Sequence, residues 1–280
     1  MIECPRDAMQ GLSGFIKTDL KVAYINQLLR VGFDTLDFGS FVSPKAIPQM
    51  RDTAEVLAKL DLSATNTKLL AIVANQRGAA EACQHGEIQY LGYPFSISET
   101  FQLRNTNATI AESMERTQDI QDLCVRHGKK LVLYLSMGFG NPYGDPWNVE
   151  IVQQWVDALL PYGIHIFSLS DTIGCSNPEN IAYLFDTLIP TYPHIAFGAH
   201  LHTQPQSWRE KVEAAWEHGC RRFDGALRGF GGCPMAKDDL TGNMATENLL
   251  DFCGEMQADL SIDRAEFGKS LEMADRVFPH

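Results

Sequence analysis

Two histidines that follow an apolar run, His200 and His202, have a spacing that could bind a metal ion. The residues before them, 195–199, predict a buried strand, and side chains two residues apart on a strand share a face. Two imidazoles at the end of a strand can bind one divalent ion. The same pair is also compatible with two structural histidines in a polar patch, so the rest of the chain has to decide.

Three further side chains could take part in chemistry. Asp7 and Arg6 follow the first apolar run, and Cys233 lies in a loop with three glycines, 229–234. An arginine beside a metal can hold a carboxylate, or an enolate oxygen as it gains charge. A thiol in a glycine-rich loop is more exposed than a core cysteine and can donate a proton or act as a nucleophile. The alternative interpretation of Asp7 is an ordinary turn aspartate, and that of Arg6 is a surface ion pair.

The elements that must position these residues alternate between short apolar runs and longer amphipathic ones. Helices are predicted over 19–29, after the cap Thr109-x-x-Glu112 and after Asn177-Pro178, and closing helices near 245–256 and 261–277. Eight strand–helix repeats predict an α/β fold, a (β/α)8 TIM barrel with additional C-terminal helices, as a single catalytic domain over 1–280. Strands are predicted at 2–4, 35–41, 68–74, 88–93, 131–136, 165–169, 195–202 and 220–226.

A closed barrel would bring the candidate residues together. The first, seventh and eighth strands are neighbours in such a barrel, so Asp7 can approach His200 and His202 at the carboxyl ends of the strands. One carboxylate, two imidazoles and one further oxygen ligand suit Mg²⁺ or Mn²⁺ with positions left open for a substrate.

Bulk properties restrict the partners. The chain has 280 residues and a formal net charge of −12, which argues against nucleic acid and anionic membranes. No apolar run reaches transmembrane length, and residues 1–7 lead directly into predicted structure, so no targeting segment is expected. Seven irregularly spaced cysteines indicate a reducing, cytoplasmic location rather than a disulfide framework. The closing helix pair offers a surface for a homodimer.

The chain resembles the 3-hydroxy-3-methylglutaryl-CoA lyases over essentially its whole length. Its glycine–cysteine loop and the Ser-Phe-Val-Ser-Pro-Lys segment are the most specific features. The matching segments are Arg-Asp-Ala-Met-Gln at 6–10, Ser-Phe-Val-Ser-Pro-Lys-Ala-Ile-Pro-Gln-Met at 40–50, Ser-Leu-Ser-Asp-Thr-Ile-Gly at 168–174, His-Leu-His at 200–202, Gly-Gly-Cys-Pro at 231–234 and Gly-Asn-Met-Ala-Thr-Glu at 242–247.

The resemblance implies a set of site residues. It assigns metal ligation to Asp7, His200, His202 and Asn243, and it adds Asn243 as the missing oxygen ligand. It implies that Arg6, Asp7 and Cys233 take part in catalysis. The residues expected to support the site or contact the substrate are Gln10, Asp37, Tyr134, Asp171 and Glu247. At Asp37 the chain departs from the glutamate that is usual in this family.

The implied reaction is the cleavage of 3-hydroxy-3-methylglutaryl-CoA to acetoacetate and acetyl-CoA by a metal-assisted retro-aldol step. Arg6 would stabilise the enolate, Cys233 would protonate it, and Asp7 or a neighbouring histidine would act as the first base. A related lyase or a Claisen-type synthase acting on another 3-hydroxy acid or acyl-CoA is the alternative. A barrel without catalytic activity is a third interpretation, but none of its expected signs, such as a lost metal ligand, is present.

Overall fold

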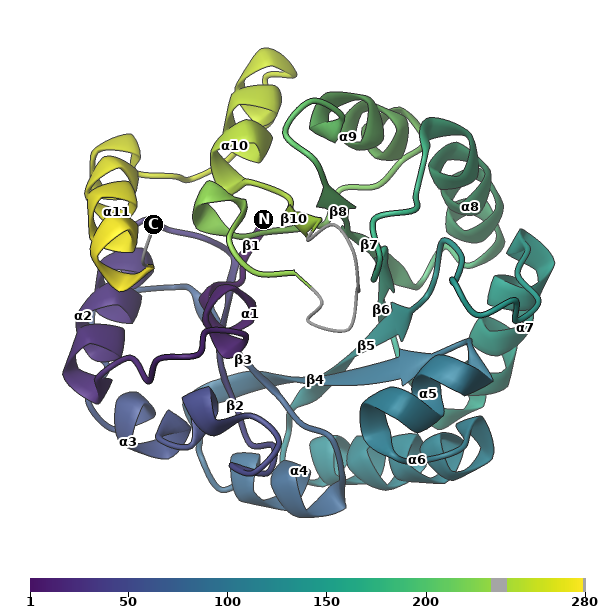
Figure 1. The fold of residues 1–280 in the computed structure, drawn as a ribbon, viewed down its shortest axis with the longest axis horizontal. Helices are drawn as coiled ribbons and strands as arrows, with labels where there is room; N and C mark the ends of the chain where they lie inside the picture. The colour runs from purple at the N-terminus through teal and green to yellow at the C-terminus, as the bar shows by residue number, and fades with distance from the viewer. Residues whose placement is uncertain (233–240, 279–280) are drawn as a thin grey trace.

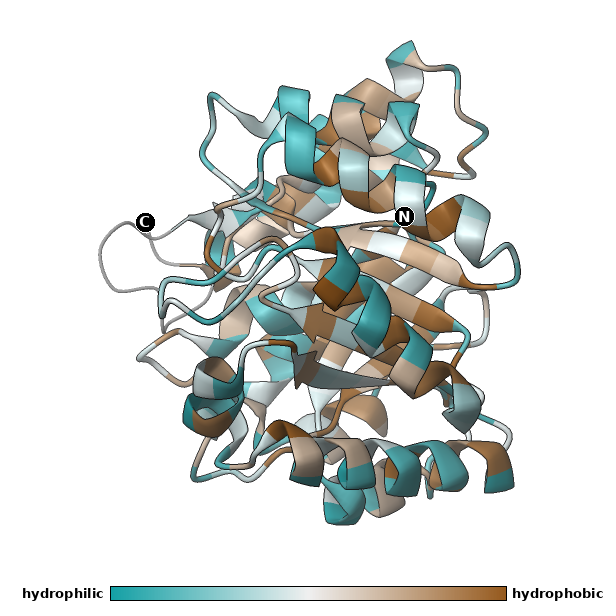
Figure 2. Cartoon of the chain, turned by 90° about the vertical axis from the view of Figure 1, so that its right-hand side faces the viewer, coloured by the Kyte–Doolittle hydropathy of each residue, from teal (hydrophilic) through white to brown (hydrophobic). Residues whose placement is uncertain are grey.

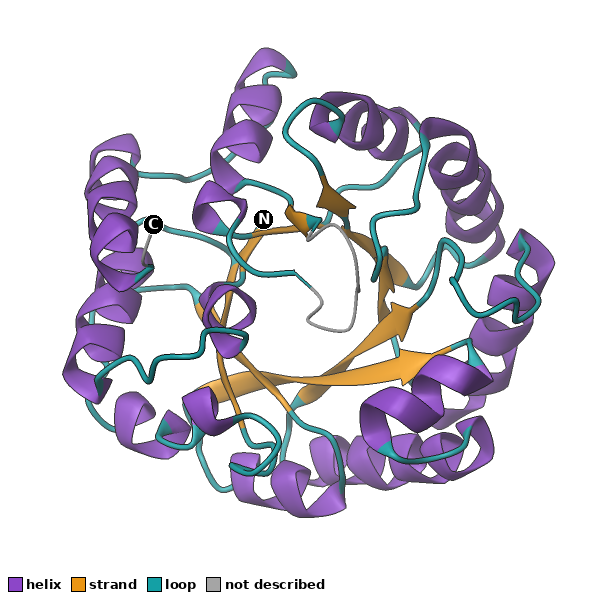
Figure 3. Ribbon diagram, viewed as in Figure 1, coloured by secondary structure: helices purple, strands orange, loops and turns teal. Residues whose placement is uncertain are grey.

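Eight parallel strands close into a barrel, which confirms the predicted fold class (Figures 1 and 3). The computed structural model describes residues 1–232 and 241–278. Around the barrel the strand order is β1-β2-β3-β4-β5-β6-β7-β9, and β8 pairs antiparallel with β10 in a separate two-stranded sheet. The strands are β1 (Ile2–Glu3), β2 (Thr35–Ser40), β3 (Lys68–Ile72), β4 (Ile88–Ser96), β5 (Lys130–Ser136), β6 (Ile166–Ser170), β7 (Ala196–His200), β8 (His202–Thr203), β9 (Phe223–Gly225) and β10 (Gly242–Asn243).

Helices form a ring outside the strands, and α10 and α11 take their places in it as the predicted closing helices (Figure 1). The α-helices are α1 (Pro5–Gln10), α2 (Thr18–Leu29), α3 (Thr53–Leu57), α4 (Gln76–Ala82), α5 (Glu99–Thr106), α6 (Ile110–Arg126), α7 (Val149–Leu159), α8 (Pro178–Thr191), α9 (Trp208–Glu217), α10 (Thr246–Glu255) and α11 (Arg264–Val277). Short 3-10 turns are η1 (Pro48–Met50), η2 (Leu160–Tyr162) and η3 (Leu227–Gly229). In the described part of the chain, no helix combines the length and the apolar character that a membrane crossing requires.

Sequence patterns fix several helix starts. Thr109 and Glu112 form the predicted capping box at the start of α6, and Asn177 caps α8 with Pro178 in the first turn. These side chains satisfy backbone N–H groups that have no partner inside the helix. The main hydrophobic core lies between the strands and the helix ring, where the brown sides of the helices face inward in Figure 2. A smaller cluster of Leu70, Val132 and Tyr134 is separate from it.

The histidine pair does not lie on one strand, which corrects the prediction of a single strand over 195–202. β7 ends at His200, Leu201 separates the two histidines, and β8 begins at His202. β8 leaves the barrel and pairs with β10, where Asn243 stands directly opposite His202. The pairing of β8 with β10 brings Asn243, which follows the glycine loop in the sequence, next to the histidine pair.

The first and last strands of the barrel are also shorter than predicted. β1 ends at Glu3, and Arg6 and Asp7 lie in the first turns of α1 rather than at a strand end. Pro5 allows this because proline fits the first turn of a helix, where its missing N–H costs no hydrogen bond. The eighth barrel strand, β9, covers only three of the seven residues predicted over 220–226.

A buried acid, Glu3, links β1 to two later segments. Its carboxyl group accepts hydrogen bonds from the Leu227 backbone at 3.0 Å and the Thr246 hydroxyl at 2.5 Å. Burial raises the pKa of Glu3 from the ordinary 4.5 to about 8, and these two hydrogen bonds only partly oppose that effect. The carboxyl group is therefore mostly protonated at neutral pH.

The raised pKa of Glu3 predicts a loss of stability with rising pH. Between pH 4.5 and about 8 the unfolded chain has released this proton and the folded chain has kept it, so the free energy of unfolding falls across that window. In Glu3→Gln the amide oxygen can still accept from the Leu227 backbone, and the amide nitrogen can donate to the Thr246 hydroxyl oxygen. The variant has no titration at this position, so its urea midpoint should fall less with rising pH than that of the parent protein. Glu87→Gln on the surface is the control. Equal slopes for all three proteins would contradict the prediction.

Candidate active site

Arg6 forms the centre of a buried charge cluster at the carboxyl end of the barrel. Its Nε lies 3.0 Å from Asp37 Oδ2, its Nη2 lies 2.5 Å from the same oxygen, and its Nη1 lies 2.9 Å from Asp7 Oδ1. Arg6 and Asp7 are each 7% exposed and Asp37 only 1%. One guanidinium therefore holds a carboxylate from β2 and another from α1, and N–H groups remain on both terminal nitrogens.

The pKa values of Asp37 and Asp7 depend on burial and on the neighbouring charges. Burial raises the pKa of Asp37 to about 6 in spite of Arg6, which still leaves this carboxyl group ionised at neutral pH. Burial acts in the same direction on Asp7, but Arg6 and the two histidines outweigh it and lower the pKa of Asp7. Asp7 is consequently a carboxylate over the whole neutral range.

The four residues predicted to bind a metal meet in one place. Ligand atoms of Asp7, His200 and His202 all lie within 4.8 Å of one another. The amide nitrogen of Asn243 donates hydrogen bonds to Asp7 Oδ2 at 2.8 Å and to the Phe230 carbonyl at 2.9 Å. The amide oxygen of Asn243 is therefore the atom left to act as a ligand.

His202 supplies the strongest test of whether these residues fit a cation. Within the described residues, neither of its buried ring nitrogens has a hydrogen-bond partner in ordinary geometry. Burial and the neighbouring His200 lower the pKa of His202 to about 4, so the imidazole is neutral at pH 7 and able to bind a metal. A buried polar group without a partner is costly, and a bound divalent cation would satisfy it.

A cavity of about 250 Å³ opens beside this group. Arg6, Asp7, His200 and His202 line one side of it, and Gly232 also reaches it. Further lining residues come from α5 and from the loop between β2 and η1, including Phe101, Asn105, Thr106, Val42 and Ile47. The cavity thus combines a charged end with a mixed apolar and polar wall, as small-molecule sites do.

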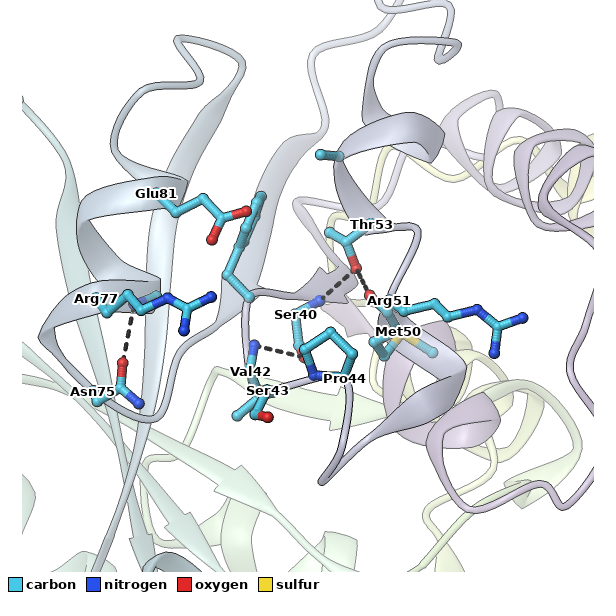
Figure 4. A pocket seen from close by; sticks show the side chains of 13 residues that line it. Ser40, Val42, Ser43, Pro44, Met50, Arg51, Thr53, Asn75, Arg77 and Glu81 are labelled. Carbon is cyan, nitrogen blue, oxygen red and sulfur yellow. Dashed lines mark hydrogen bonds between the residues drawn. The ribbon is translucent and has the colours of Figure 1, made fainter.

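A second cavity, of about 140 Å³, lies between the β2–η1 loop and α4 (Figure 4). Figure 4 shows Arg77 and Glu81 on its α4 side, across from Pro44 and Thr53. Val42 lines both cavities, but among the described residues the second one contains none of the candidate ligands. Among the described residues, Asp7, His200 and His202 therefore line only the larger of these two cavities.

A family model described as HMGL-like matches residues 3–272. The chain belongs to the HMGL-like family. Hydroxymethylglutaryl-CoA lyase YngG of Bacillus subtilis is 32% identical over 258 residues, which cover 92% of this chain and 85% of YngG. Hydroxymethylglutaryl-CoA lyase of Pseudomonas mevalonii is 32% identical over 88% of this chain and 81% of its own length. The structure of an HMG-CoA lyase from Acinetobacter baumannii in complex with coenzyme A and 3-methylmalate superposes with a TM-score of 0.90 at 31% identity, covering 99% of this chain and 90% of that one.

Two of the predicted supporting residues of this HMGL-like chain lie directly beside the ligand group. Gln10 donates from Nε2 to Asp7 Oδ1 at 2.7 Å, so this oxygen receives hydrogen bonds from both Gln10 and Arg6. The Tyr134 ring lies edge-on to His200, with 5.7 Å between ring centroids, and lines the cavity. Tyr134 therefore limits how far the His200 ring can turn.

The other three supporting residues, Asp37, Asp171 and Glu247, do not line the cavity of this HMGL-like chain, and Asp37 contacts Arg6 as described above. Asp171 binds Lys211 at 3.0 Å, and Lys211 in turn donates to the His202 carbonyl at 2.9 Å. Glu247 accepts a hydrogen bond from the Arg228 backbone at 3.1 Å. Asp171 thus reaches the backbone of His202 through Lys211, Glu247 contacts the backbone of Arg228, and a supporting role for both residues stays a prediction.

Cys233 lies outside the described residues, but the glycines before it are described. Gly231 and Gly232 have φ angles of +89° and +130°, which L side chains rarely adopt. A Cβ atom at Gly231 would lie 2.7 Å from Asn243 Nδ2 and 2.8 Å from the Asp7 carbonyl. Only glycine lets the backbone pass this close to two of the candidate ligands.

Sequence reasoning missed Asp224, which contacts His200. Its Oδ2 lies 3.1 Å from His200 Nδ1, and the side chain is completely buried in β9 of the HMGL-like barrel. Together with the adjacent Asp7, it raises the pKa of His200 against the opposing effect of burial. The signal was a charged residue inside a predicted buried strand, because such positions rarely carry a charge without a partner.

Proposed function

We propose that this HMGL-like protein is a carbon–carbon lyase that cleaves 3-hydroxy-3-methylglutaryl-CoA into acetoacetate and acetyl-CoA. The observation that carries the proposal is the convergence of Arg6, Asp7, His200 and His202 on one cavity, with Asn243 hydrogen-bonded to Asp7 beside it. Similarity over almost the whole chain to proteins named hydroxymethylglutaryl-CoA lyase supports the same reaction.

A divalent cation, Mg²⁺ or Mn²⁺, held by Asp7, His200, His202 and Asn243 would lower the pKa of the substrate's tertiary hydroxyl group. Asp7 or a neighbouring histidine takes that proton, and the lowered pKa of Asp7 makes it the weaker base of the two. The bond between carbons 2 and 3 then breaks. The hydroxyl carbon becomes the ketone of acetoacetate, and the bond's electron pair moves into the thioester enolate.

Arg6 stabilises the enolate oxygen through the N–H groups that its carboxylate partners leave free. Asp37 and Asp7 hold the guanidinium in place before the charge develops, so little reorganisation is needed during the reaction. Cys233 donates a proton to the enolate carbon, which completes acetyl-CoA. The branched acyl group occupies the cavity and the nucleotide of coenzyme A extends beyond it.

The direct experiment is to incubate the purified protein with 3-hydroxy-3-methylglutaryl-CoA and Mg²⁺ or Mn²⁺ and to measure acetoacetate and acetyl-CoA. Equal amounts of both products are expected, and their formation should stop when EDTA removes the metal. A second 3-hydroxyacyl-CoA in parallel tests the alternative of a related lyase. Folded, metal-loaded protein that yields no acetoacetate would reject the proposed reaction.

Cys233→Ser should lower kcat by about 100-fold or more, because a serine hydroxyl is a much weaker acid than a thiol and general acid catalysis typically contributes that much. Metal content and the urea midpoint should not change. Cys175→Ser is the matched control, since Cys175 is an exposed residue of the β6–α8 loop and is not among the described residues that line the larger cavity. Near-normal turnover of Cys233→Ser would remove this residue from the mechanism.

A further inference from the structure

We propose that Arg222 is a positioning residue of this site, which fixes His200 through Asp224 and so sets the affinity for the divalent cation. This inference rests on the metal site of the proposed function, but it does not depend on the identity of the substrate. Arg222 and Asp224 both belong to the β9 region, two residues apart, and therefore point into the barrel on the same side of the strand.

Asp224 is held between two partners. Arg222 Nη1 lies 3.1 Å from one carboxylate oxygen, and His200 Nδ1 lies 3.1 Å from the other. The Ser168 hydroxyl is 3.4 Å from the oxygen that faces His200. With one oxygen bound to the arginine, the carboxylate cannot rotate without losing an ion pair, so the second oxygen stays directed at the imidazole.

This arrangement decides which nitrogen of His200 is free. A carboxylate at Nδ1 keeps the proton there and leaves Nε2 as the atom that can bind a cation. A carboxylate with 0% side-chain exposure would be strongly disfavoured next to a neutral imidazole alone. Arg222, whose side chain is 18% exposed, supplies the compensating charge in direct contact.

The neighbouring strand makes room for the arginine. A Cβ atom at Gly198 in β7 would lie 2.8 Å from Arg222 Nη1 and 3.1 Å from its Cγ and Cδ. Gly198 has no positive φ, so alanine would be compatible with its backbone and would act only by displacing the arginine. The close approach shows that the Arg222 side chain lies flat against β7 on its way to Asp224.

Arg222 acts at a distance from the substrate. Among the residues that line the larger cavity, as far as the structure describes them, neither Arg222 nor Asp224 appears, whereas His200 does. Arg222 reaches the site through Asp224, which contacts His200, and through a side-chain hydrogen bond with Tyr134, whose ring lies edge-on to His200. Both contacts lead to His200, so the effect of Arg222 should be visible in metal binding without any substrate.

The test is the dissociation constant for Mn²⁺, measured from the EPR signal of the free ion in protein first treated with EDTA. Arg222→Met should weaken binding by about 10-fold, at the lower end of what outer partners of metal ligands contribute. Gly198→Ala should weaken binding in the same direction, and Arg222→Lys should retain part of the affinity. Arg221→Met is the matched control, because Arg221 is exposed and stacks on Trp216 outside the barrel.

A double-mutant cycle separates positioning from a general electrostatic effect. If Arg222 acts through Asp224, then Arg222→Met should cause no further loss in an Asp224→Asn background. Equal losses in both backgrounds, or unchanged Mn²⁺ affinity in a folded Arg222→Met variant, would overturn the inference. If Arg222→Met does not fold, Arg222→Lys and Gly198→Ala decide, and normal affinity in both also overturns it. Failure of the parent protein to bind Mn²⁺ would instead reject the metal site itself.

Discussion

Replacing Arg6 with methionine is expected to lower kcat by about 1,000-fold, the largest catalytic loss of any single substitution outside the metal ligands. The guanidinium would act on charge that exists only after the carbon–carbon bond begins to break. Its loss should therefore reduce kcat and kcat/KM by similar factors and leave KM nearly unchanged. Steady-state kinetics with 3-hydroxy-3-methylglutaryl-CoA measure this directly.

The substitution also leaves two buried carboxylates without their cation, so its effect on folding has to be separated from its effect on catalysis. Asp37 is only 1% exposed and depends on Arg6 for its charge-assisted hydrogen bonds. The double variant Arg6→Met/Asp37→Asn removes the buried charge together with its partner. It should recover much of the lost urea midpoint and remain inactive.

Arg6→Lys gives a graded comparison. Lysine keeps the positive charge, but it cannot contact Asp37 and Asp7 with the planar fork that arginine provides. We expect its kcat to lie between those of the parent protein and Arg6→Met. A higher KM with an unchanged kcat in Arg6→Met would assign Arg6 to substrate binding and not to the transition state.

The barrel could be predicted from the sequence because each of its signals is local. Alternating apolar and amphipathic runs and the caps at Thr109 and Asn177 depend only on neighbouring residues. The strand break between His200 and His202 was missed because Leu201 is apolar and continues the pattern. What ends the strand is the pairing of β8 with β10, about forty residues later, which no local pattern contains.

The candidate site divides in the same way. His200 and His202 were recognisable by type and spacing, and the chain's own residues also pointed to Asp7. Asn243 came only from the resemblance, since an asparagine after a glycine has no distinctive local signal. Asp224 and Arg222 were missed because their role depends on which side chains a closed barrel places face to face.

Replacing His202 with leucine is expected to weaken metal binding and to stabilise the metal-free protein. His202→Leu should weaken Mn²⁺ binding by 100-fold or more, on the order of the loss that follows removal of a metal ligand or its close partners, and should abolish turnover. The same change should raise the urea midpoint of the metal-free protein. Titration with Mn²⁺ and urea unfolding in EDTA measure the two effects separately.

The gain in stability follows from the environment of the imidazole. His202 is 4% exposed, and among the described residues neither ring nitrogen has a hydrogen-bond partner in ordinary geometry, although the Thr172 backbone lies close enough to affect the pKa of the ring. A buried polar group in that state costs about 1–3 kcal/mol, and leucine fills a similar volume without polar atoms.

His218→Leu serves as the control, because that histidine is 32% exposed and paired with Asp186 at 2.8 Å, so its loss should not stabilise the protein. A His202→Leu variant that is less stable without metal would mean that the ring has a role in the fold itself. A variant that gains stability but still binds Mn²⁺ normally would instead remove His202 from the ligand set. The cost of His202 to folding would then need another functional explanation.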